Sequence, residues 1–119
     1  MSFISKRLKS FSYAFRGIGT MFSAGGNAFV HAFATVCVVA AGLIFHLSKF
    51  EWIAVVFAIG IVLAAETFNT AIEELADKVS PEYDQAIGKV KDMAAGAVLW
   101  CAIAAAIVGL IVFVPHIVS

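Results

Sequence analysis

The stretch that decides the fold is residues 52–72, which read WIAVVFAIGIVLAAETFNTAI. Residues 52–65 carry no charged side chain. A helix needs about 20 mostly apolar residues to cross a bilayer, and this stretch has that length. Towards its end it carries a carboxylate, Glu66, and an amide, Asn69. The stretch therefore predicts a transmembrane helix that has polar groups near one end.

Two further segments, residues 28–47 and 93–114, have the same apolar character. The chain has 119 residues, of which 62% are hydrophobic, and its mean hydropathy is +0.99. No Lys, Arg, Asp or Glu occurs between Arg16 and Lys49, and none follows Asp92. A water-soluble chain of this size has too little core to bury so much apolar surface. We therefore expect an all-α membrane protein, with residues 1–119 forming one domain that has three spans.

The segment before the first span alternates basic and apolar residues. At helical spacing its apolar side chains gather on one side and the basic ones on another; the apolar set is Phe3, Ile4, Leu8, Phe11, Phe15, Ile18 and Phe22. This is the pattern of a helix that lies in the membrane interface, with basic groups among the lipid headgroups. We expect such a helix over residues 2–23, ended by Gly25 and Gly26 where the chain turns into the membrane.

The basic residues also predict the topology. The N-terminal segment has four of them, and the loop expected over residues 78–91 has three, whereas the tight turn expected over residues 48–51 has one. The positive-inside rule therefore places the N-terminus and the second loop in the cytoplasm. The net charge is zero and there is no basic tract, so no nucleic-acid partner is expected. His31, His46 and His116 are widely spaced and form no ligand motif.

The candidate chemistry lies in four side chains that we call the polar row: Glu66, Asn69, Glu73 and Asp77. On a helix they fall within an arc of roughly 80°. An ionisable group at membrane depth is costly unless it is paired or faces a polar cavity, so it usually serves a function. Like charges on one face repel each other. Mg²⁺ held by one or two carboxylates and by nucleotide phosphates would meet that need.

The alternative is that the polar row only joins helices, as polar side chains in membranes do. For Asn69 alone, both interpretations stay open. A second cluster, Lys89, Lys91 and Asp92, precedes the third span. Lys89 has the character of a topology marker, whereas the small residues after Asp92 allow helices to approach closely and bring Lys91 near the polar row. A lysine there can hold phosphate oxygens.

These motifs resemble the prokaryotic diacylglycerol kinase and undecaprenol kinase family, from about Phe11 through the third span. The resemblance rests on Glu66-x-x-Asn69-Thr-Ala-Ile-Glu73-x-x-x-Asp77, on Pro81-Glu82-Tyr83 and on Lys91-Asp92-x-Ala-Ala. It implies an interfacial helix, three transmembrane helices and a homotrimeric bundle with active sites between subunits, in the bacterial cytoplasmic (inner) membrane. The implied reaction is transfer of the γ-phosphate of ATP, with Mg²⁺, to a lipid alcohol such as diacylglycerol or undecaprenol.

The resemblance also implies roles for single residues. Glu66 and Asn69 are the catalytic residues, with Glu66 as the general base at the lipid hydroxyl. Glu73 binds Mg²⁺, and Lys6 together with Glu66 contacts the lipid substrate. The residues implied in ATP binding are Tyr13, Glu73, Asp77, Glu82, Tyr83, Asp84, Lys91 and Asp92.

One position departs from the family pattern. Where the family has Glu-x-Asn-Phe-Arg before the first span, this chain has Gly25-Gly26-Asn27-Ala28-Phe29. One acidic metal ligand is therefore missing, and Asn27 or water would have to replace it. The acceptor also stays open among diacylglycerol, undecaprenol and a sphingoid base. A non-catalytic trimeric membrane protein that uses the polar row as a polar seam is the alternative outside the enzyme class.

Overall fold

A computed structural model describes residues 2–24 and 27–119, and these residues form four α-helices and no strand. The helices are α1 (Phe3–Ser23), α2 (Ala28–Phe45), α3 (Lys49–Val79) and α4 (Gln85–Val118). The predicted all-α class is confirmed, and α2, α3 and α4 are long and apolar enough to cross a membrane. The predicted helix break and the departure at Gly25 and Gly26 lie outside the described residues.

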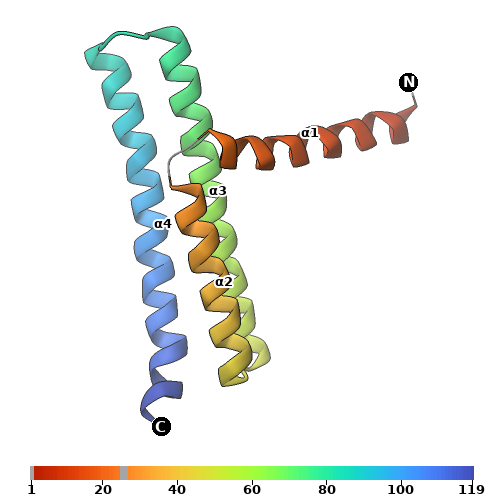
Figure 1. Cartoon of the computed structure of the whole chain (residues 1–119), viewed down its shortest axis with the longest axis vertical. Helices are drawn as coiled ribbons and strands as arrows, with labels where there is room; N and C mark the ends of the chain where they lie inside the picture. The colour runs from red at the N-terminus through yellow and green to blue at the C-terminus, as the bar shows by residue number, and fades with distance from the viewer. Residues whose placement is uncertain (1, 25–26) are drawn as a thin grey trace.

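The three long apolar helices form a bundle, from which α1 projects sideways (Figure 1). Helices α3 and α4 run side by side in opposite directions, and α2 lies along α3. Because short connections join α2 to α3 and α3 to α4, each of these pairs of helices is antiparallel. This arrangement leaves much of each apolar helix exposed, as expected for side chains that face lipid.

Helix α1 reaches the bundle only at its C-terminal end. It begins at Ser2, whose hydroxyl accepts a hydrogen bond from the Ser5 N–H at 3.1 Å. Its side chains are exposed up to Thr20, apart from half-buried Ser5, whereas Met21 is buried. There the Thr67 hydroxyl of α3 contacts the Met21 sulfur at 2.7 Å. Helix α1 therefore meets α3 at the level of Thr67, as a helix on the membrane surface would.

The connection between α2 and α3 differs from the tight turn predicted over residues 48–51, and that prediction is wrong. Lys49 begins α3, because Ser48 and Glu51 form a capping box. The Ser48 hydroxyl accepts from the Glu51 N–H at 3.2 Å, and the Glu51 carboxylate accepts from the Ser48 N–H at 2.9 Å. Helix α2 ends at Phe45, two residues before the predicted 47, because His46 has a left-handed backbone with a φ of 54°.

The second loop is also shorter than the predicted 78–91, since it comprises residues 80–84 only. The Asp84 carboxylate caps α4 by accepting hydrogen bonds from the N–H groups of Ala86 and Ile87 at 2.9 and 3.1 Å. Helices α3 and α4 therefore extend beyond the predicted spans 52–72 and 93–114. Lys78 and Lys91 are therefore helical residues rather than loop residues.

The other end of the bundle, which we call the distal end, contains residues 42–55 and 112–118. Its core is the buried cluster Leu47, Val55 and Val112. The Trp52 ring packs directly on Gly42, where an added Cβ would lie 2.6 Å from the ring. His116 near the end of α4 contacts Glu51 at 2.8 Å. The distal end thus joins α2, α3 and α4 by packing and by one polar pair.

Candidate active site

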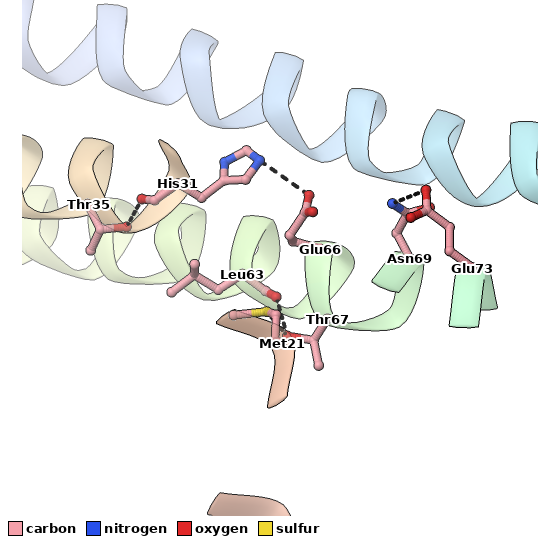
Figure 2. A network of polar contacts seen from close by, with 8 residues as sticks. All are labelled: Met21, His31, Thr35, Leu63, Glu66, Thr67, Asn69 and Glu73. Carbon is pink, nitrogen blue, oxygen red and sulfur yellow. Dashed lines mark hydrogen bonds and ion pairs between the residues drawn. The ribbon is translucent and has the colours of Figure 1, made fainter. Parts of the chain in front are cut away.

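The polar row begins at Glu66, which is only 3% exposed. Its Oε2 lies 3.4 Å from Nε2 of His31 on α2, as Figure 2 shows. His31 was not among the site residues predicted from the sequence. A signal was available, because His31 is the first titratable side chain after Arg16 and lies in an apolar span. Titratable groups at that depth usually have a polar partner.

Asn69 and Glu73 form the next part of the row. The Asn69 amide donates to Glu73 Oε1 at 3.2 Å (Figure 2). The other end of this amide, Oδ1, is buried and has no hydrogen-bond partner among the described residues. A buried carbonyl oxygen without a partner is costly, so it is available to a further donor or to a cation. Glu73 itself is exposed.

The row ends at Asp77, which pairs with Lys91 from α4 at 2.8 Å. The structure thus brings Lys91 to the polar row, as the small residues of α4 predicted. Both side chains are partly exposed, 39% for Lys91 and 65% for Asp77. An exposed pair of this kind contributes little to stability. Its importance is that it holds an ammonium group at the end of the acidic row.

Spacing along α3 separates the members of the row. At about 1.5 Å per residue, Glu73 lies about 10 Å from Glu66 along the helix axis and Asp77 about 16 Å. No cluster of three metal-ligating side chains occurs among the described residues. The donors near Glu73 are one carboxylate and the Asn69 oxygen. This set fits Mg²⁺, which often binds through one or two carboxylates and takes its other ligands from phosphates and water.

A second polar surface lies between α1 and α3. A groove of about 420 Å³ is lined there by Tyr13, Arg16, Thr70 and Glu74, among others. The Arg16 guanidinium lies 5.5 Å from the centre of the Tyr13 ring, within cation–π range. The sequence predicted Tyr13 as a site residue but missed Arg16 and Glu74. The signal for Arg16 was its position as the last cation before the uncharged stretch.

The two polar surfaces lie on different sides of α3. In Figure 2 the α4 ribbon passes on one side of α3, and Met21 of α1 lies on the other. Tyr13 therefore shares a groove with Glu74, whereas Asp77 contacts Lys91 on the α4 side. The residues predicted to bind ATP are thus divided between two sides of α3.

The remaining predicted residues are dispersed. Lys6 precedes Met21 by 15 residues, or about 22 Å of helix, so the fold of the chain does not bring it to Glu66. Glu82 and Tyr83 are exposed in the second loop, and Asp92 is exposed on α4. The Asp84 carboxylate caps α4. Their predicted roles in ATP binding stay predictions.

Fold and site together define a multi-span helical membrane protein whose acidic row begins beside an interfacial helix. Comparison with known proteins gives the family. The profile of the family described as prokaryotic diacylglycerol kinase matches residues 12–113. An undecaprenol kinase of Bacillus subtilis (strain 168) is 34% identical over 114 residues, which cover 96% of this chain and 93% of that protein.

A diacylglycerol kinase of Synechocystis sp. (strain ATCC 27184 / PCC 6803 / Kazusa) is 36% identical over 113 residues, which cover 94% of this chain. This chain spans 65% of the length of the Synechocystis protein. The chain belongs to the prokaryotic diacylglycerol kinase family. The resemblance noted from the sequence is confirmed, and the enzyme is a lipid kinase of the membrane.

Proposed function

We propose that this protein transfers the γ-phosphate of Mg-ATP to the hydroxyl of a long-chain lipid alcohol, with Glu66 as the general base. The observation that carries the proposal is the position of Glu66. Its carboxylate is buried one residue from Thr67, where α1 meets α3. If α1 lies in the interface, Glu66 lies at the depth of a lipid hydroxyl.

The reaction needs positioning and charge stabilisation more than covalent chemistry. Glu66 accepts the proton of the lipid hydroxyl while the hydroxyl oxygen bonds to the γ-phosphorus and the bond from phosphorus to the ADP oxygen breaks. General-base catalysis of this kind typically contributes 10²- to 10⁴-fold to a rate. The buried setting excludes competing water from the carboxylate.

The nucleotide would lie along the rest of the polar row. Glu73 and the free Asn69 oxygen are the groups that would hold Mg²⁺ with the phosphates, and the ion would neutralise phosphate charge. Lys91 would bind phosphate oxygens as a point charge after exchanging its contact with Asp77. Glu82, Tyr83, Asp84 and Asp92 would contact the remainder of ATP from the loop and the start of α4.

We propose a homotrimer with sites between subunits. Support comes from the division of the predicted ATP residues between two sides of α3. A nucleotide that contacts both Tyr13 and Lys91 within one protomer would have to pass around α3. A neighbouring subunit can instead present its α1 to this protomer's polar row, and it can bring Lys6 there as well. Chemical cross-linking in membranes tests the number of subunits.

For the acceptor we propose undecaprenol before diacylglycerol or a sphingoid base. The support is the match of the chain to nearly the whole length of the undecaprenol kinase of Bacillus subtilis. For localisation we propose the cytoplasmic (inner) membrane of a bacterium, with the N-terminus and the second loop in the cytoplasm. The basic residues of those two regions support this orientation.

The decisive experiment is transfer of labelled γ-phosphate from Mg-ATP to a panel of lipid alcohols in bilayers. We expect label in undecaprenol and its loss in Glu66→Gln. A folded, trimeric protein that labels no lipid would contradict the kinase proposal, unless Gly25→Glu, which restores the acid of the family pattern, restores transfer. Failure of that variant as well would favour the non-catalytic polar seam.

A further inference from the structure

Glu66 has a specific neighbour that the proposed mechanism does not yet use. His31 Nε2 lies 3.4 Å from Glu66 Oε2, and the side chains are 18% and 4% exposed. Among the described residues, His31 is the one basic side chain within ion-pair distance of Glu66. The two residues come from different helices, α2 and α3, so the contact depends on how these helices pack.

The surroundings of His31 offer few polar partners to the imidazole. Its ring lines a cavity of about 160 Å³ between α2, α3 and α4. The other lining side chains are aliphatic, apart from Thr35 and Phe113, and His31 is the one titratable group among them. The Thr35 hydroxyl donates a hydrogen bond to the backbone carbonyl of His31 at 2.8 Å, so it does not bind the imidazole. Glu66 is therefore the charged group that His31 faces from the neighbouring helices.

We infer that His31 is a positioning residue for Glu66, an inference that rests on the proposed function. The imidazole carries its proton on Nε2 and presents this N–H to Oε2 of the carboxylate. This contact orients the carboxylate of Glu66. Oε1 then remains for the lipid hydroxyl. During transfer the hydroxyl proton moves to Oε1, and His31 keeps its own proton.

The main alternative is that the pair only holds α2 against α3. The kinetics of His31 variants separate the two roles. We expect His31→Leu to lower kcat about tenfold to a hundredfold, a part of what a general base supplies. KM for Mg-ATP should stay within about twofold, because His31 lies far from Lys91 along the bundle.

Matched variants make the test specific. The side-chain amide of His31→Gln can reach the position of Nε2, so it should recover part of the rate, whereas the shorter His31→Asn should recover less. His46→Asn removes a histidine from the end of α2, at a left-handed position that Asn tolerates. This control should leave kcat and KM unchanged. If His31→Leu fails to assemble, the rates of His31→Gln and His31→Asn decide between the positioning role and the structural role. Equal rates for these two variants would overturn the inference.

Two further measurements distinguish failure of this inference from failure of the proposed function. In a Glu66→Gln background, His31→Leu should have no additional effect on the residual rate, because His31 acts through Glu66. ¹⁵N NMR of labelled histidine should show His31 protonated on Nε2 in the wild type and altered in Glu66→Gln, whether or not any lipid is phosphorylated. If the wild type is active and His31→Leu has the same kcat, the role of His31 is overturned and the kinase proposal stays intact.

Discussion

The chain contains two contacts between a histidine and a glutamate, and they lie about 22 Å apart along α3. His31 and Glu66 meet at 3.4 Å beside the end of α1, whereas His116 and Glu51 meet at 2.8 Å at the distal end. In each, a residue of α3 meets a residue of another helix. The side groups are chemically the same, so any difference in their roles must come from their surroundings.

The pair at the distal end, His116 and Glu51, makes further contacts with neighbouring residues. Glu51 accepts a hydrogen bond from the Ser48 N–H and lies in the first turn of α3, where a carboxylate is favoured by the helix dipole. Both side chains of the pair are 27% exposed. The Phe45 ring lies beside His116, with 5.9 Å between ring centres. These contacts hold α3 and α4 together at the distal end.

The Glu66 carboxylate has the opposite character. It is nearly fully buried, lies well inside α3 and accepts no backbone hydrogen bond among the described residues. Such a carboxylate stabilises the fold less than its burial costs. A buried carboxylate that is not used by the backbone remains free for chemistry. The carboxylate that we propose as the base therefore has fewer local hydrogen bonds than the carboxylate of Glu51.

The strongest test of this comparison replaces each carboxylate by its amide. Glu66→Gln should lower kcat by about 10²- to 10⁴-fold, because the amide accepts no proton. Glu51→Gln should retain the kinase rate and lower the melting temperature in detergent. An active Glu66→Gln enzyme, or an inactive but well-folded Glu51→Gln enzyme, would break the distinction.

Magnesium gives the second test. Chelation should abolish transfer, and added Mg²⁺ should restore it. Glu73→Gln should raise the Mg²⁺ concentration for half-maximal rate about tenfold or more, since loss of even an outer-shell partner typically costs tenfold to a hundredfold in metal affinity. Glu51→Gln is the matched control at the distal end. An unchanged Mg²⁺ requirement in Glu73→Gln would remove Glu73 from the metal site.

Lys91 and Asp77 form a third pair, and its role can be assigned by kinetics. Lys91→Ala should raise KM for ATP about tenfold, the equivalent of roughly 1.4 kcal/mol. Lys89→Ala removes a neighbouring exposed cation and should leave KM unchanged. If Lys91→Ala lowered only the melting temperature, this pair would belong with the structural contacts of the distal end.

The smallest effect is expected at the capping box. Ser48→Ala should destabilise the protein by about 1 kcal/mol, because the Glu51 N–H loses its acceptor. Thermal unfolding in detergent measures this change, and the kinase rate should stay constant. Ser10→Ala, at an exposed hydroxyl of α1 that bonds the Lys6 carbonyl, should change stability by less than about 0.5 kcal/mol. Loss of activity in Ser48→Ala would show that the distal end influences the site.

The sequence by itself determined the helices and their membrane character. Long apolar runs can satisfy their backbone in a bilayer only as helices, so the spans around residues 28–47, 52–72 and 93–114 follow from hydropathy. The helical period likewise determined that the four polar side chains of α3 share one face. The motifs that contain these residues also resemble those of the diacylglycerol kinase family, a resemblance that the comparison confirmed. All of these are local properties of the chain.

Only the tertiary structure decided which groups meet. The contact of His31 with Glu66 depends on the rotation and packing of α2 against α3. The groove that Tyr13 and Arg16 share with Glu74 depends on where α1 meets α3. The helix ends also differ from the predicted ones. Ser48 and Asp84 cap α3 and α4 before the residues at which hydropathy alone predicts the spans to begin. Hydropathy describes each residue with respect to lipid and water, whereas these pairings are set by contacts between residues far apart in the chain.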